Sequence, residues 1–141
     1  MNKLISFIAV SLICISAHAQ ETREDWSKRL KQPNLNIEGL TAAMAKGMSQ
    51  PKGQKLDQNA ISLGSSAVKK NIYIDSQFTS QASEAQIEIV KNMAPKLFNQ
   101  QVCATPVMFV LVKEHGVTVS YRWFDQNMKE LMVTLVDSKN C

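Results

Sequence analysis

The chain has 141 residues, a formal net charge of +4 and three cysteines. This length is enough for one domain with a modest hydrophobic core. The basic residues are scattered along the sequence, whereas a nucleic-acid-binding protein would gather them into one stripe with aromatic residues between the charges. We therefore expect no nucleic acid among the partners of this protein.

Residues 1–19 have the three parts of a secretory signal. Lys3 supplies a short positive segment, residues 4–15 are almost continuously apolar, and Ala17 and Ala19 precede a suitable cleavage point by three residues and one. The apolar run is about half the length that a helix needs to span a bilayer, roughly 20 residues. We expect cleavage after Ala19. The remaining chain should not insert stably into a membrane and should lie in the periplasm or outside the cell.

Two alternatives to cleavage after Ala19 stay open. The first is a signal that is retained as a membrane anchor. The second is a lipoprotein signal cut before an acylated Cys14, which the sequence disfavours because the bulky Ile13 stands where such signals have a small residue.

Removal of the signal leaves two cysteines, Cys103 and Cys141. An even number of cysteines in an exported protein predicts a disulfide. Closure of a loop of this length should stabilise the fold by about 4 kcal/mol. The sequence contains no CxxC motif, and two thiols alone do not make a zinc site, so a structural bridge is favoured over a redox or metal-binding pair.

Residues 20–53 form an N-terminal helical segment. Apolar residues recur at intervals of three and four in two stretches. The first stretch is a helix that ends before Pro33, and the second is a helix that ends before the break at Pro51. An exposed apolar helix face often marks an interaction site, and the alternative is that this face is folded back on the sheet as core. The candidate partner surface consists of Trp26, Leu30, Leu40, Met44 and Met48.

Residues 54–141 are predicted to form a disulfide-bridged α+β domain, one domain with the helical segment. Strands are expected at 56–63 and 67–78 around a turn at 64–66. A helix follows from Ser80 or Ser83, and Pro95 is expected to kink it or to begin a second short turn.

A second helix is predicted over 106–115. Pro106 suits a first helical position and Gly116 the residue past a helix end. The run Val107–Val112 is rich in β-branched residues and would also fit a buried strand, but the signals at both ends favour a helix.

A hairpin is predicted at the end of the chain, with strands at 117–124 and 130–136. Asn127 is expected to take a left-handed conformation in the turn. This hairpin should form the spine of a small antiparallel sheet of about four strands, in the order α-α-β-β-α-α-β-β, with the helices packed on one face and the bridge Cys103–Cys141.

The last third of the sequence resembles a widespread family of small exported proteins of Gram-negative bacteria, most of them uncharacterised. The matching residues run from Cys103-Ala104-Thr105-Pro106 through Gly116-Val117-Thr118 and Tyr121 to Asp125, and end at Cys141. The chain departs from these relatives at Asn127, where they have glycine, and in its apolar helix after the first cysteine. The resemblance implies a fold and carries no catalytic residues.

No catalytic, cofactor-binding or metal site is expected. His115 is the only histidine after the signal, and its place in the last helical turn suits a cation at a helix end. A hydrolase built around His115 is kept as the enzymatic alternative, although no nucleophile is visibly paired with it.

The favoured function is a non-enzymatic periplasmic interaction or accessory protein of the cell envelope. The alternative is a secreted virulence-associated factor or an inhibitor acting outside the cell. Pilot proteins of type II secretion share the small, exported, disulfide-bridged character. The expected partner is an envelope or extracellular protein, and the sequence leaves the oligomeric state open.

Overall fold

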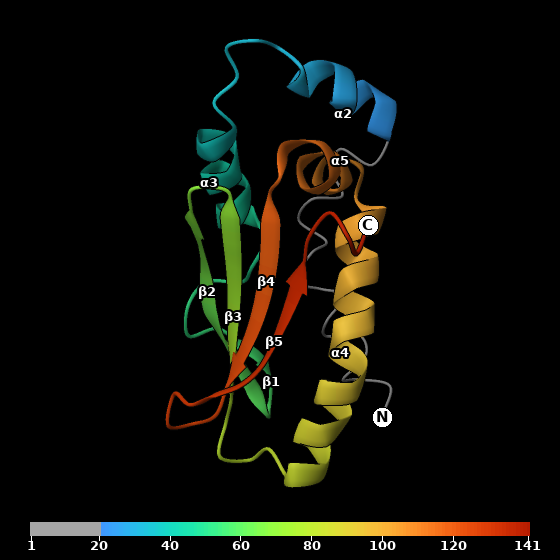
Figure 1. Cartoon of the computed structure of the whole chain (residues 1–141). Coiled ribbons are helices and arrows are strands. Elements are labelled where there is room, and N and C mark those ends of the chain that lie inside the picture. The colour runs from blue at the N-terminus through green and yellow to red at the C-terminus, as the bar shows by residue number, and fades with distance from the viewer. Residues whose placement is uncertain (1–20) are drawn as a thin grey trace.

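The structure is a computed structural model that describes residues 21–141 (Figure 1). The predicted signal at 1–19 lies outside the described residues. The helices are α2 (Arg23–Leu30), α3 (Ile37–Gly47), α4 (Glu84–Ala104) and α5 (Pro106–His115). The strands are β1 (Lys55–Asp57), β2 (Ala60–Val68), β3 (Asn71–Phe78), β4 (Thr118–Phe124) and β5 (Glu130–Val136).

The five strands form one sheet in the order β1-β2-β3-β4-β5. The pairs are antiparallel except for β3 and β4, which are parallel. The parallel pair follows from α4 and α5, which carry the chain back to the starting end of β3 before β4 begins. The predicted α+β class is confirmed, while the sheet is mixed and has five strands rather than about four.

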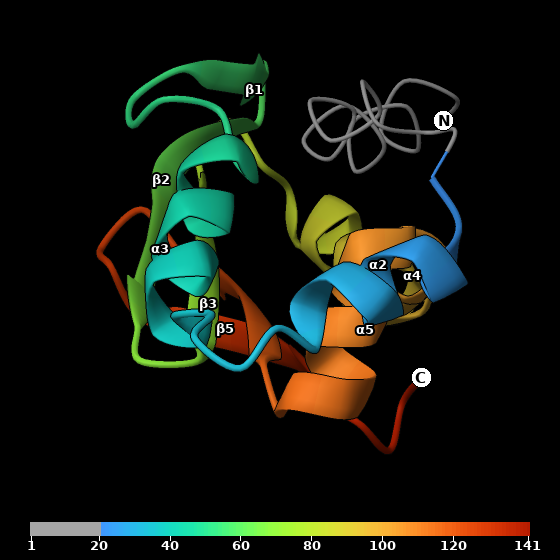
Figure 2. The ribbon, with the colours of Figure 1, turned by 90° about the horizontal axis from the view of Figure 1, so that it is seen from above.

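All four helices lie on one face of the sheet, as predicted (Figure 2). The strands alternate accordingly: in β3, Ile72, Ile74 and Phe78 are buried, and in β4, Val119 and Trp123 are buried. These inward side chains and the apolar faces of the helices make a single core. No helix of residues 21–141 covers the opposite face of the sheet.

The N-terminal strands differ from the prediction. The expected strand 56–63 is divided, because the Asp57 carboxylate accepts a hydrogen bond from the amide of Asn59 (2.6 Å) and turns the chain between β1 and β2. The expected turn at 64–66 is wrong: Gly64, with φ of 90°, lies in a bulge inside β2. The hairpin turns instead at Lys69, which has φ of 54°.

Helix α4 begins with a reciprocal cap. The Ser83 hydroxyl accepts from the Gln86 amide, and the Gln86 side chain accepts from the Ser83 amide. The helix continues through Pro95 to Ala104, so the structure has one helix here and no second short turn. Buried Ala94 and Phe98 on either side of Pro95 hold the two halves against the core.

The C-terminal elements follow the prediction closely. Helix α5 has Pro106 in its first turn and ends at Gly116, with φ of 69°. In the β4–β5 turn the left-handed residue is Met128 (φ 64°), not Asn127, because the Asp125 carboxylate accepts hydrogen bonds from the amides of Asn127 and Lys129.

The predicted disulfide is confirmed. Cys103 and Cys141 are bonded, with their Cα atoms 5.4 Å apart, and the bridge ties the C-terminal segment to the last turn of α4. Within residues 21–141, no helix has the length and apolar character needed to cross a membrane.

Candidate interaction surface

The apolar face predicted as a partner surface is packed into the molecule. Leu30 and Met48 are 5% and 0% exposed, and Trp26, Leu40 and Met44 are partly buried against the core. The structure therefore has the alternative that the sequence left open, in which this face is folded back. Leu30 and Met48 are not accessible to a partner in this arrangement.

Helix α2 is held by contacts with α4 and α5. The Arg23 guanidinium lies 3.7 Å from the centre of the Phe109 ring and donates a hydrogen bond to the Cys103 carbonyl (2.8 Å). The Ser27 hydroxyl donates to the Glu114 carboxylate (2.8 Å). These contacts explain why a helix of eight residues stays on the body of the protein.

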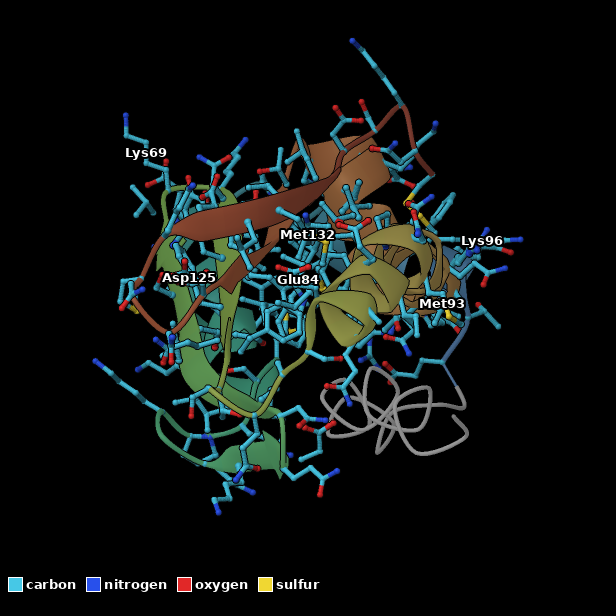
Figure 3. The ribbon with its side chains drawn as sticks, turned by 90° about the horizontal axis from the view of Figure 1, so that it is seen from below. Lys69, Glu84, Met93, Lys96, Asp125 and Met132 are labelled. Atoms are coloured by element: carbon cyan, nitrogen blue, oxygen red, sulfur yellow. A yellow bond between two sulfur atoms is a disulfide. The ribbon has the colours of Figure 1, made fainter. Side chains whose placement is uncertain are left out.

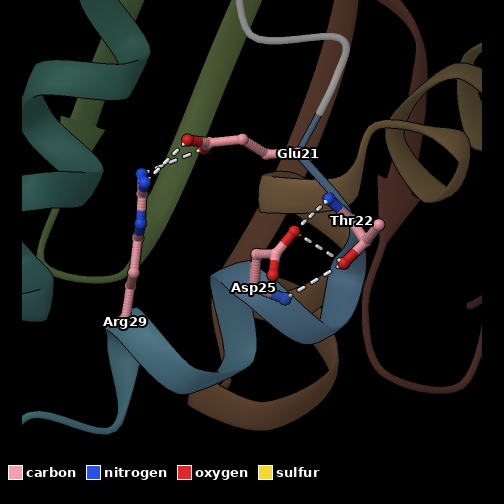
Figure 4. Close-up of polar contacts among 4 residues, drawn as sticks. All are labelled: Glu21, Thr22, Asp25 and Arg29. Carbon is pink, nitrogen blue, oxygen red and sulfur yellow. Dashed lines mark hydrogen bonds and ion pairs between the residues drawn. The ribbon is translucent and has the colours of Figure 1, made fainter.

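A capping box begins α2 (Figure 4). The Thr22 hydroxyl accepts from the Asp25 amide (3.2 Å), and the Asp25 carboxylate accepts from the Thr22 amide (3.0 Å). Chiefly because of this backbone hydrogen bond, the pKa of Asp25 lies below its ordinary value of 3.8. The stabilisation by the cap is therefore present above about pH 4 and is lost as the carboxylate is protonated in more acidic solution. Glu21 and Arg29 form a further ion pair beside it (2.8 Å).

The face of the sheet that the helices leave uncovered is the candidate interaction surface, and we call it the outer face. Its side chains alternate along each strand with those of the core, and the register places them in rows across β3, β4 and β5. The outer face is defined by Val68, Tyr73, Asp75, Arg122, Phe124, Val133 and Leu135.

An ion pair lies at the centre of the outer face. Arg122 donates two hydrogen bonds to the Asp75 carboxylate, 2.8 Å from Nε to Oδ1 and 2.7 Å from Nη2 to Oδ2. Asp75, chiefly through these hydrogen bonds, raises the pKa of Arg122 above its usual value. The guanidinium carbon also lies 4.7 Å from the Tyr73 ring centre and 5.6 Å from that of Phe124. The charge is thus fixed in position between two aromatic rings.

Apolar side chains extend the outer face to both sides of this ion pair. Val68 in β2 is 59% exposed, and Val133 and Leu135 in β5 are 47% and 50% exposed. Val133 lies opposite Arg122 in the β4–β5 register. In protein interfaces, arginine and aromatic residues surrounded by apolar contacts often contribute most of the binding energy.

The sequence analysis missed this surface. One signal was present: β5 is apolar on both of its alternating faces, although only one face of the sheet is covered. Tyr73 and Phe124 gave a second signal, since they stand among polar residues at the solvent-facing positions of their strands.

Tyr121 and Trp123 lie in the core, as expected from their alternation. Tyr121 stacks on Phe98, with ring centres 4.8 Å apart, and its oxygen accepts a hydrogen bond from the Ser76 hydroxyl (3.3 Å). Burial raises the pKa of Tyr121 to about 12.

His115 lies at the last position of α5, as predicted, with its Nε2 buried and without a hydrogen-bond partner. No three histidine, cysteine, aspartate or glutamate side chains of residues 21–141 gather in a way that would hold a metal ion. Among residues 21–141, no serine, threonine or cysteine side chain forms a hydrogen bond with His115.

Solved structures of proteins from Pseudomonas and Vibrio are similar to this chain. A provisionally assigned secreted protein from Pseudomonas aeruginosa matches with a TM-score of 0.61 and 10% identity, over 74% of this chain and 92% of that chain. The type II secretion system pilotin AspS from Vibrio cholerae matches with a TM-score of 0.51 and 14% identity, over 75% and 93%. The pilotin EpsS from Vibrio vulnificus aligns with a TM-score of 0.47 and 11% identity, over 84% and 96%.

No family model matches the chain, and no curated protein matches its sequence. At identities of 10% and 14% the likeness to the first two solved structures shows a shared fold.

Proposed function

We propose that this chain is an exported, non-enzymatic accessory protein of the cell envelope that binds a partner protein through the outer face of its sheet. The observation that carries the proposal is the uncovered sheet face, where Arg122 is held between Tyr73 and Phe124 next to exposed apolar side chains. Burial of the apolar side chains on this face by a partner would be favourable, because apolar area removed from water contributes roughly 25 cal/mol per Å².

The pairing of Arg122 with Asp75 supports recognition of a protein rather than of an isolated anion. The bidentate pair neutralises the charge of Arg122 and occupies two of its N–H donors, which lowers its attraction for an anion. The two rings and the aliphatic row of β5 lie beside this pair. Such a mixed surface suits the apolar and aromatic side chains of another protein.

The solved structures of the same fold support an envelope setting. One of them is a type II secretion system pilotin, and we infer that this chain has an accessory role of a related kind, with a protein of the envelope as its partner. The predicted signal at 1–19 and the bridge between Cys103 and Cys141 agree with export. The resemblance of the last third of the chain to small exported proteins of Gram-negative bacteria stays a prediction.

The test is a cross-linking pull-down from envelope fractions with two variants of the full chain. Tyr73→Ser and Phe124→Ser remove one ring each from the outer face, and Ile89→Ser removes an exposed apolar side chain from α4 as a control. We expect the wild type and the control to recover the same dominant protein, and each outer-face variant to recover at least about tenfold less.

Two results would contradict the proposal. Recovery of the partner at wild-type level by both outer-face variants would move the binding surface elsewhere. Accumulation of the protein in the culture medium, with no envelope partner, would favour the released factor that acts outside the cell.

A further inference from the structure

The turn between β2 and β3 consists of two lysines. Val68 pairs with Asn71, so Lys69 and Lys70 alone connect the two strands. Both lysines are exposed, and Lys69 projects away from the body of the protein (Figure 3). Lys69 has a φ of 54°, a left-handed conformation that glycine or asparagine adopts more readily in a two-residue turn. The preference of the backbone therefore does not explain why lysine stands here.

Two further lysines lie at the same end of the sheet (Figure 1). The turn lies beside the start of β4, since the Lys70 carbonyl accepts a hydrogen bond from the Thr118 amide (3.0 Å). β5 is antiparallel to β4 and therefore ends here as well. The segment after β5 contains Lys139, and Nζ of Lys113 in α5 donates a hydrogen bond to the carbonyl of Ser138 in that segment (2.9 Å).

These lysines give this end of the sheet an excess of positive charge. We call it the basic end, and it is defined by Lys69, Lys70, Lys113 and Lys139. All of them are exposed, and none forms an ion pair within residues 21–141. The carboxylates next to them in sequence are those of Glu114 and Asp137, which accept hydrogen bonds from the Ser27 hydroxyl and the Lys139 amide.

An exposed apolar side chain accompanies the lysines of the turn. Val68 is 59% exposed, the largest exposed fraction among the large apolar side chains of residues 21–141. It directly precedes Lys69, so the same tip of the hairpin carries an apolar group and two positive charges.

The lysines are spread across the basic end. β3 and β5 lie on either side of β4, which separates Lys70 from Lys139 by two strand spacings, about 10 Å. A small soluble anion needs donors that converge on it. An anionic bilayer instead presents phosphates over a plane, and an apolar side chain can enter the boundary beneath them. The spread charges and the projecting Val68 fit the bilayer.

We propose that the basic end lies against the surface of a membrane that contains anionic phospholipids. The lysines contact the headgroup phosphates, and Val68 reaches the boundary of the acyl chains. The contact is peripheral, and the strands point away from the bilayer. Tyr73 and Phe124 take no part in it, so this contact stands independently of the partner proposed for the outer face.

Co-sedimentation of the full chain, exported and purified in oxidised form, with phospholipid vesicles tests the proposal. One set of vesicles contains equal parts of phosphatidylglycerol and phosphatidylcholine, and the other contains phosphatidylcholine alone. We expect at least about tenfold stronger binding to the first set, and weaker binding as salt is added, because salt screens the charges. Equal binding to both sets, or binding to neither, would overturn the proposal.

Two double variants with the same net charge locate the contact. Lys69→Asn with Lys70→Gln removes both charges of the turn, and asparagine suits the left-handed position. Lys55→Gln with Lys129→Gln removes two exposed lysines at the opposite end of the sheet and is the matched control.

The two variants should differ strongly in vesicle binding. A lysine near an anionic surface contributes about fivefold to binding, so the turn variant should bind about twentyfold more weakly. The control should change by less than about twofold. An equal loss in both variants would mean that only the net charge matters, and would overturn the proposal.

Val68→Trp tests the apolar contact separately from the charges. With phosphatidylglycerol vesicles, its fluorescence relative to the wild type should shift to shorter wavelength, because tryptophan prefers the membrane boundary. Ile89→Trp on α4 is the control and should show no such shift. The absence of a shift at position 68 would contradict the proposal, and so would release of the protein from the vesicles by free glycerol phosphate.

Discussion

At the scale of single residues, the polar groups of this protein are fixed by short-range partners on both sides of the sheet. Arg122 on the outer face is bound by Asp75 on the neighbouring strand. Tyr121, one residue earlier, points into the core, where its hydroxyl accepts a hydrogen bond from Ser76. Neighbouring positions in one strand therefore lie on opposite faces of the sheet, one on the outer face and one in the core.

Tyr121→Phe should make the protein more resistant to alkaline unfolding. The pKa of Tyr121 is about 12 in the folded protein against an ordinary value of 10, so its neutral form stabilises the fold fully below pH 10 and this contribution is lost as the pH rises from 10 to 12. Two pKa units correspond to about 3 kcal/mol. Urea unfolding at pH 8 and pH 11 measures the difference, and equal pH dependence in both proteins would contradict it.

Asp75→Asn should lower the free energy of unfolding by about 1 kcal/mol, because the pair with Arg122 is only partly buried and solvent screens its charges. Lys91→Ala, which removes a more exposed ion pair on α4, is the control and should change stability by less than half of that. A loss of several kcal/mol in Asp75→Asn would mean that the pair is central to the fold, not to the surface.

At the scale of elements, the features that depend on local sequence signals were predicted, and those that depend on tertiary contacts were not. Helix α5 and the β4–β5 hairpin were predicted correctly because Pro106, Gly116 and a regular alternation act over a few residues. The parallel pairing of β3 with β4 was not predicted, since it depends on the path of the chain through α4 and α5. The bulge at Gly64 was mistaken for a turn because glycine provides the same backbone freedom to both.

The candidate surface could not be predicted from the helices, because it also depends on how the elements pack. The spacing of Leu40, Met44 and Met48 correctly indicates an apolar helix face, but it cannot distinguish a face against the sheet from a face against another protein. Only the arrangement of the helices on one side identifies the uncovered surface, which lies on the strands (Figure 2).

Arg23→Ala should loosen α2 without unfolding the domain. The variant loses the contact with the Phe109 ring and the hydrogen bond to the Cys103 carbonyl, a cost of about 1 kcal/mol at an exposed site. Amide hydrogen exchange should become faster in α2 and stay unchanged in β4. Lys28→Ala, which removes an exposed pair within α2, is the control, and equal exchange in both variants would argue against a specific role of Arg23.

At the scale of the whole molecule, the disulfide and the one-sided arrangement of helices complement each other. The bridge fixes Cys141, at the end of the segment after β5, to the last turn of α4. Within residues 21–141, a single layer of helices leaves one face of the sheet open to solvent. The fold thus presents a rigid, prearranged surface.

Reduction of the bridge should lower the free energy of unfolding by about 4 kcal/mol, given a separation of 38 residues between Cys103 and Cys141. Urea unfolding with and without reductant measures this loss, and a variant with serine at both positions should match the reduced protein. An unchanged unfolding midpoint would show that the C-terminal segment is held by other contacts.

Site-specific photo-cross-linking in living cells is the measurement that tests the binding role of the outer face most directly. A photoreactive phenylalanine replaces Phe124 on the outer face or Ile89 on α4, both in the exported full chain. We predict a single cross-linked envelope protein from position 124 and none from position 89. A product from position 89 alone would place the binding surface on the helices and contradict the account.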